Sequence, residues 1–134
     1  MTNFDRKYLI WALGYAAAGM ILGIYMASSR NHGEFVTHAH ILLVGFVASL
    51  IYAVIHRLWL PAPSRALATA QFVLHQAGSI AMFVGLLLLY GGFASEDRLA
   101  PLLAPSAIAV LLGVLVMLFM VIRAPARALA HEAL

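Results

Sequence analysis

The chain has 134 residues, of which 64% are hydrophobic and only 10% are charged, and its formal net charge is +3. This length allows one domain, and the composition excludes an ordinary soluble globule, because long uncharged runs are typical of integral membrane proteins. The chain has no cysteine, which excludes disulfides, thiolate metal sites and thiol catalysis. The basic residues are scattered at the edges of apolar runs, so we expect a lipid bilayer and not nucleic acid as the partner.

Four apolar runs predict an all-α fold, an integral membrane four-helix bundle that forms one domain over residues 1–134. In chain order, the expected spans are residues 8–28, 36–58, 66–91 and 101–122. The short segment between the second and third spans contains two prolines and allows only a turn between antiparallel helices. Pro101 and Pro105 stand near the start of the last run, so its regular helix is expected to begin only after Ala104.

Basic residues gather at one side of the predicted bundle. With four spans, both termini lie on the same side as the turn between the second and third helices. That side carries most of the basic residues, whereas the opposite loops mix basic and acidic ones, so the positive-inside rule predicts cytoplasmic termini in a multi-pass protein of the bacterial inner (cytoplasmic) membrane. The residues on the first side are Arg6, Lys7, Arg57, Arg65, Arg123 and Arg127, and those in the opposite loops are Arg30, Glu34, Glu96, Asp97 and Arg98.

The first span carries small residues at the spacing that allows two helices to approach closely. Gly19 and Gly23 form one such pattern, and Gly14 and Ala18 form another. Either pattern fits a contact between two copies of the chain or ordinary packing within one copy. Because such patterns are common in membrane helices, we favour packing within one copy.

Two histidines, His38 and His40, interrupt the start of the second apolar run. On a helix, positions two residues apart are separated by about 200° of rotation, so the two imidazoles are expected to point to nearly opposite sides. This geometry disfavours one metal ion chelated by both rings, since helical chelation uses positions three or four apart. It fits a helix with something to bind on each flank.

The two histidines are expected to lie on helix faces of different character. His38 falls on a face of small and polar residues, which we expect to turn into the bundle. The face of His40 is aliphatic, and it fits lipid, a neighbouring helix or the flat apolar surface of a porphyrin. The residues that share the face of His38 are Gly45, Ser49, Tyr52 and His56, and those that share the face of His40 are Val44, Val47 and Ile51.

His75 lies inside the third span. It is either a metal ligand or a partner in a hydrogen bond across the bundle, with Gln71 and Ser79 beside it on the helix. At 1.5 Å per residue, His40 and His75 differ in depth by about 10 Å, which disfavours a single haem clamped between them.

The remaining histidines lie at the ends of helices or outside them. His56 borders the turn and is expected at the membrane interface, and solvent exposure is expected for His32 in a loop and His131 in the tail. A haem held by either outer histidine would need its second ligand from Met26, from His32 or from a second chain, or would keep that position open.

The stretch Thr37–Val47, with the sequence THAHILLVGFV, resembles a late helix of the catalytic subunit of haem-copper oxidases, and it is most similar to the nitric oxide reductase and cbb3-like branches. Residues 71–78, QFVLHQAG, resemble the family's following helix, in which a His and a Trp stand where this chain has Gln71 and Val73. The resemblance covers about residues 36–92 and includes Ile51, Tyr52, Leu58 and Pro61.

In that family, the first histidine of the pair holds a high-spin haem and the second a low-spin haem on opposite flanks of one helix. The resemblance therefore implies that His38 and His40 ligate haem b, and we include Gly45 and Met26 in the candidate haem site. The family's histidines for copper or non-haem iron lie on other helices, which this chain lacks, so a complete O2 or NO reduction site is not expected. A second copy of the chain would supply the missing axial ligand and give an eight-helix homodimer.

The leading hypothesis is a membrane-bound b-type haem protein that serves electron transfer or binds a diatomic gas such as O2 or NO. The candidate metal ligands are His38, His40 and His75. One alternative is binding or transport of copper or zinc, in which His56 joins His38 and His75, and Met26 is a softer ligand. Another is a small accessory or structural subunit of a respiratory complex, whose histidines only bridge helices. No catalytic residue is assigned, because the acidic residues lie outside the apolar runs, although an oxidoreductase-like activity stays open.

Overall fold

A computed structural model describes residues 3–126, and within that range it contains helices and no strand. α1 spans Phe4–Ser29, α4 spans Arg65–Tyr90 and α5 spans Glu96–Arg123. The second helix consists of three consecutive segments, which are α2 (Phe35–His40), η1 (Ile41–Val47) and α3 (Ala48–Leu58). The prediction of an all-helical fold with four apolar helices is confirmed, because four helices are long and apolar enough to cross a membrane.

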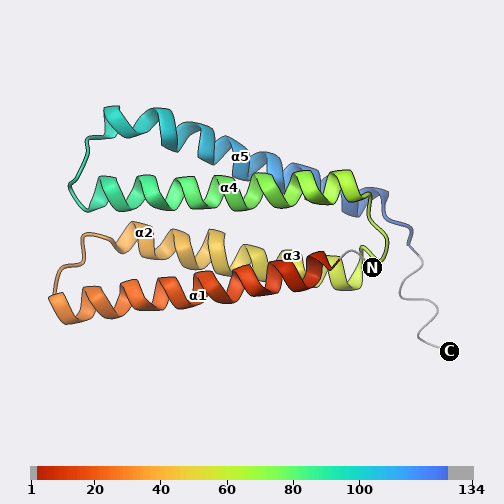
Figure 1. The fold of residues 1–134 in the computed structure, drawn as a ribbon, viewed down its shortest axis with the longest axis horizontal. Helices are drawn as coiled ribbons and strands as arrows, with labels where there is room; N and C mark the ends of the chain where they lie inside the picture. Colours follow the sequence, from red (N-terminus) through yellow and green to blue (C-terminus); the bar gives the residue numbers. More distant parts are fainter. Residues whose placement is uncertain (1–2, 127–134) are drawn as a thin grey trace.

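The helices form two antiparallel hairpins (Figure 1). In the first hairpin, α1 packs along η1 and α3, and in the second, α4 packs along α5. The start of α1, the turn between α3 and α4 and the end of α5 lie at one end of the bundle, which we call the turn end (Figure 1). The opposite end holds the two loops that connect α1 to α2 and α4 to α5, and we call it the loop end.

α5 begins earlier than its prolines led us to expect. The helix starts at Glu96 and includes Pro101 and Pro105, so the prediction of a start after Ala104 is wrong. Glu96 and Asp97 lie in its first turn, where acidic side chains interact favourably with the positive end of the helix dipole. Each proline removes only one backbone N–H, and membrane helices tolerate that loss.

The second helix is not a regular α-helix, because residues Ile41–Val47 form a π-helix directly after His40. A π-helix closes its hydrogen bonds over five residues instead of four, which widens each turn. The buried side chains in this stretch accordingly recur every four residues, before ordinary α-helical spacing returns. The buried residues along this line are Thr37, Ile41, Gly45, Ser49, Tyr52 and His56.

This change of period corrects the predicted face of His38. The four other residues predicted for that face are buried as expected, whereas His38 is only half-buried, and Thr37 takes its place in the buried line. The faces were predicted with the α-helical period of 3.6 residues per turn. Along a π-helix, whose turns contain more residues, that period gives directions for the side chains that become more wrong with each residue. Nothing in the apolar run ILLVGFV marks the wider turns in advance.

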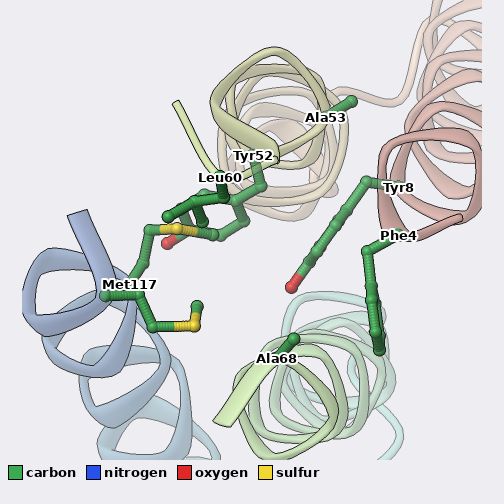
Figure 2. Close-up of a cluster of buried hydrophobic side chains, with 8 residues drawn as sticks. Phe4, Tyr8, Tyr52, Ala53, Leu60, Ala68 and Met117 are labelled. Atoms are coloured by element: carbon green, nitrogen blue, oxygen red, sulfur yellow. The ribbon is translucent and has the colours of Figure 1, made fainter. Parts of the chain in front are cut away.

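At the turn end, side chains from all four helices meet in one hydrophobic cluster (Figure 2). Tyr8 is fully buried there, and its ring packs edge-on against Tyr52, with 5.4 Å between the ring centroids. A smaller cluster, formed by Tyr15, Ile41 and Phe83, lies farther from the turn. The residues of the larger cluster are Phe4, Tyr8, Tyr52, Ala53, Leu60, Ala68, Met117 and Met120.

The outer surface of the bundle is strongly apolar. Ile21, Ile24 and Ile122 are 67%, 68% and 71% exposed, and many other large aliphatic side chains point outward in the same way. Extended apolar surfaces of this kind are rare on soluble monomers. The outward side chains therefore suit contact with lipid along the helices that are long enough to span a bilayer.

Polar side chains connect the two hairpins inside the bundle. From α1, the Tyr8 hydroxyl donates to Gln71 Oε1, and the Tyr15 hydroxyl donates to Gln76 Oε1 at 2.6 Å. From α3, the Ser49 hydroxyl is hydrogen-bonded to His75 Nε2 at 3.2 Å. We call this row the seam, and its residues are Tyr8, Tyr15, Ser49, Gln71, His75, Gln76 and Ser79, of which Ser79 follows His75 by one helical turn on α4.

Replacing Tyr15 with phenylalanine is expected to destabilise the protein by about 1 kcal/mol, because buried Gln76 loses its hydrogen-bond donor. Tyr25→Phe is the matched control, since Tyr25 is 53% exposed and its hydroxyl makes no hydrogen bond to the described residues. Thermal unfolding in detergent, followed by circular dichroism, measures both variants. Equal midpoints would show that the bond between Tyr15 and Gln76 makes no measurable contribution.

Candidate functional site

His38 lies on α2 and packs across the backbone of α1. Its Nδ1 is 2.8 Å from the carbonyl oxygen of Gly19. A Cβ atom at Gly23 would stand only 3.0 Å from Cε1 of the same ring, so the imidazole fits here because Gly23 has no side chain. The pattern of Gly19 and Gly23 thus serves packing within one chain, as we favoured from the sequence.

His40 lies two residues further along and has a different partner. Its Nδ1 is 2.8 Å from the carbonyl oxygen of Val36, one turn earlier on its own helix. His38 contacts α1, whereas His40 is held by α2 itself, so the two rings are positioned independently of each other. Both side chains are half-buried.

These contacts define which ring nitrogen carries the proton. A backbone carbonyl only accepts hydrogen bonds, so Nδ1 of His38 and of His40 must be the protonated donor, and Nε2 of each neutral ring keeps its lone pair. Neither Nε2 atom has a hydrogen-bond partner within residues 3–126, and neither is a buried atom. Metal-bound histidines show the same arrangement, with the second ring nitrogen held by a carbonyl or a carboxylate. The two imidazoles therefore share the outer hydrogen bond that metal-bound histidines show, and the Nε2 lone pair of each is left without a partner among the described residues.

His75 is fully buried and bridges helices. Its Nε2 is hydrogen-bonded to Ser49, and its ring packs edge-on against Tyr52, with 4.9 Å between the centroids. The hydrogen bond across the bundle that the sequence suggested for His75 is therefore present, and its partner is Ser49 on the opposite hairpin. Ser49 follows His40 by nine residues, so His75 and His40 lie on the order of 10 Å apart along the helix axis.

His56 is more deeply buried than its place beside the turn indicated. It is 5% exposed, and its ring stacks between Phe4 and Tyr8, with centroid distances of 5.5 and 5.7 Å. Neither of its ring nitrogens has a hydrogen-bond partner in the described part of the chain. His32 is exposed, as expected, and His131 lies outside the described residues.

The other predicted members of the haem site have packing partners of their own. A Cβ atom at Gly45 would stand 2.7 Å from Cγ of Tyr15 and 3.1 Å from Cε2 of Phe83, so the space beside this glycine is filled by side chains. Met26 is buried near the loop end of α1, with 4% of its surface exposed. Whether either residue contributes to binding haem stays a prediction.

The candidate ligands do not gather into one cluster within a single chain. Among residues 3–126, no group of three or more His, Asp or Glu side chains lies close enough to hold a metal ion. The ligand set of the copper or zinc alternative, which includes His38, His56 and His75, is therefore not assembled by one copy of the chain. The histidines of one copy are instead separated from one another, so each could supply only a single imidazole ligand.

The seam was only partly foreseen from the sequence. Tyr8, Tyr15 and Ser49 were not singled out as partners of α4, and Gln76 of α4 was not singled out as a partner of α1, although all four are buried polar groups. One signal was available, since Tyr8 and Tyr15 are seven residues apart and seven residues make about two helical turns. Two tyrosines on one face of a membrane helix indicate partners with hydrogen-bonding atoms inside the bundle.

Comparisons of the chain with protein-family models, with curated proteins and with solved structures find no match. The likeness to the haem-copper oxidase helix therefore rests on the short stretches quoted above. What the chain binds has to be argued from the geometry of its own residues.

Proposed function

We propose that the chain is a multi-pass protein of the bacterial inner membrane that binds b-type haem through His38, His40 or both. The observation that carries this proposal is the fixed tautomer of the two imidazoles, each held at Nδ1 by a backbone carbonyl with Nε2 left unpartnered within the described residues. Imidazole is a common axial ligand of haem iron, and outer hydrogen bonds of this kind orient the ring and make it more basic.

The surface beside His40 supports approach of a large apolar ligand. Of the residues predicted for its face, Val47 and Ile51 are 38% and 51% exposed, whereas Val44 is half-buried and packs against the smaller cluster of Tyr15, Ile41 and Phe83. Leu43, which was not predicted for that face, is 63% exposed. Such a surface suits the face of a porphyrin or a helix of a second copy, which are two of the partners that the aliphatic face indicated. His40 itself is half-buried, and its Nε2 is not among the fully buried polar atoms without partners.

The small number of axial imidazole ligands that one chain could supply to haem iron supports a role for a second copy of the chain. One chain presents one imidazole on each flank of α2, and His75 is engaged by Ser49. A bound haem would supply the redox or gas-binding chemistry, whereas the chain orients the ring nitrogens and excludes water with apolar side chains. Two copies, or a larger respiratory complex, would complete six-coordinate iron for electron transfer, and a lone imidazole would leave one position open for O2 or NO.

The orientation in the membrane is part of the same proposal. The turn end carries Arg6, Lys7, Arg57, Arg65 and Arg123, while the loop end combines Arg30 and Arg98 with three acidic residues. This distribution supports cytoplasmic termini by the positive-inside rule. The histidine pair would then lie near the outer surface of the membrane.

The test is the visible spectrum of the full chain, produced with haem precursor supplied and purified in detergent. A Soret band that shifts on reduction is expected, and a further shift with carbon monoxide would show an open coordination position. Absence of a Soret band under these conditions would overturn the proposal. Copper and zinc analysis of the same sample separates haem binding from the metal-binding alternative, and a protein with neither haem nor metal would fit an accessory subunit.

A further inference from the structure

A groove lies on the surface of the first hairpin, between the start of α1 and the end of α3. Its volume is about 320 Å³, near the lower end of the range of about 300–1,000 Å³ that is typical of ligand-binding pockets. The apolar part is lined by Leu9 of α1 and by Leu50, Ala53 and Val54 of α3. Figure 2 shows the small side chain of Ala53 directed toward α1, so it leaves space between the two helices.

Three charged side chains line the same groove at the turn end, and they are Asp5, Arg6 and Arg57. Nη1 of Arg57 lies 3.5 Å from Oδ2 of Asp5, and Oδ1 of Asp5 accepts a hydrogen bond from the backbone N–H of Arg6 at 2.8 Å. The guanidinium of Arg6 has no salt-bridge partner among residues 3–126, and the side chain of Arg57 is 66% exposed. Two guanidinium groups and one carboxylate therefore leave one net positive charge at this end of the groove.

The groove changes from charged to apolar along the helix axes. Leu9 follows Asp5 by four residues and Leu50 precedes Arg57 by seven, so the apolar part extends about 6–10 Å from the charged end toward the middle of the bundle. A phospholipid in one leaflet has the same order, with its phosphate at the membrane edge and its acyl chains toward the midplane. Both helices that form the groove are long and apolar enough to cross a membrane, which places the groove beside lipid.

We propose that this groove binds one anionic phospholipid, whose phosphodiester meets Arg6 and Arg57 and whose acyl chain lies along the apolar part. Guanidinium groups donate paired hydrogen bonds to phosphate oxygens, and basic pockets between membrane helices bind acidic headgroups. Because Asp5 limits the net positive charge to one, the groove matches a phosphodiester that carries an uncharged headgroup. A zwitterionic lipid would bring its ammonium group close to two guanidinium groups.

This lipid site is independent of the proposed haem site. The groove lies at the turn end of the bundle, whereas His38 and His40 lie on α2 toward the loop end (Figure 1). None of the candidate haem or metal ligands lines the groove. The lipid is therefore expected to bind whether or not haem is present.

Native mass spectrometry of the full, haem-free chain, freed of lipid in detergent, tests the site. Titration with phosphatidylglycerol and with phosphatidylethanolamine of the same acyl chains gives the dissociation constant of the first bound lipid. Phosphatidylglycerol is expected to bind about fivefold more tightly, the effect of one favourable charge near an acidic headgroup. Equal affinity for the two lipids would overturn the proposal. Inorganic phosphate has no acyl chain and should not compete, and competition by phosphate would assign the groove to free anions instead.

Charge variants at the groove have expected effects of opposite sign. Arg6→Gln and Arg57→Gln should each weaken binding of phosphatidylglycerol about fivefold, because each removes a positive charge beside the phosphodiester. Asp5→Asn should strengthen it, because the carboxylate repels the phosphate. Arg65→Gln is the matched control and should leave the affinity unchanged, since Arg65 is an exposed arginine at the same end of the bundle that does not line the groove.

Two results with these variants would contradict the groove as the lipid site. An equal loss in Arg65→Gln and Arg6→Gln would show only a general attraction between the basic end of the bundle and acidic lipid. A changed share of dimer in the mass spectra of Arg6→Gln and Arg57→Gln, with unchanged lipid affinity, would assign the groove to contact with a second copy. The three groove positions are exposed or half-buried, so the variants are expected to fold, and a thermal midpoint for each one verifies this.

Discussion

Under the proposed haem binding, replacing His38 and His40 together with alanine is expected to lower the affinity of the chain for haem by a factor of about 100 or more, because even loss of a group that only orients a metal ligand costs about 10- to 100-fold. The reason lies in the two Nε2 atoms, which are the accessible imidazole acceptors near the loop end of α2. Haem titration of the purified chain, followed at the Soret band, measures the affinity.

The single variants make this prediction sharper. His38 is held by α1 and His40 by its own helix, so His38→Ala and His40→Ala should remove different spectral components if both rings bind iron. His32→Ala is the matched control, since His32 is an exposed histidine at the same end of the bundle. A double variant with the haem affinity of the unchanged chain would exclude ligation by this pair, and a loss in His32→Ala would assign a ligand role to the loop.

Replacing Gly45 with alanine is expected to destabilise the protein by about 1–3 kcal/mol, because the added methyl group has no room. Its Cβ would stand 2.7 Å from Cγ of Tyr15 and 3.1 Å from Cε2 of Phe83, which come from α1 and α4. Gly45 lies within the π-helix at the point where both neighbouring helices approach it, so the strain reaches both hairpins. Thermal unfolding in detergent measures the loss.

Gly14→Ala is the control for this change. Apart from its chain neighbours and the adjacent backbone of α1, no heavy atom that the structure describes lies within 4 Å of a Cβ at Gly14. Alanine in an exposed helix position gains about 0.5–1 kcal/mol over glycine. The two variants are therefore expected to shift the midpoint in opposite directions. A Gly45→Ala protein as stable as Gly14→Ala would contradict the close packing around the π-helix.

The four helices were predictable because each depends mainly on the residues of its own segment. A continuous run of about 20 apolar residues is enough to define a membrane helix, whatever its neighbours are. The predicted end of the second span and the predicted start of the third accordingly agree with the end of α3 and the start of α4. The start of α5 was placed too late, since the rule that proline ends a helix was taken from soluble proteins and has less force in a membrane.

The candidate ligands were predictable only as residue types. An imidazole within an apolar run is conspicuous, and the rotation between positions two apart follows from helix geometry alone. The partner of the His38 ring was not predictable, because Gly19 lies on another helix and its carbonyl reaches His38 only after the hairpin has packed. The same holds for Ser49 and His75, whose contact requires α3 and α4 to adopt one register.

The sequence by itself determined that this protein has four apolar helices, two histidines on different flanks of the second helix and most of its basic residues at one end. Each of these properties depends on the chemistry of neighbouring positions along the chain. The tertiary structure alone decided the π-helix after His40, the stacking of His56 on Phe4 and Tyr8, and the hydrogen bonds that join the two hairpins along the seam. These features depend on which side chains meet across helices. The change of helical period cannot be recognised in the apolar run Ile41–Val47 alone, because it depends on how the neighbouring helices pack against that run.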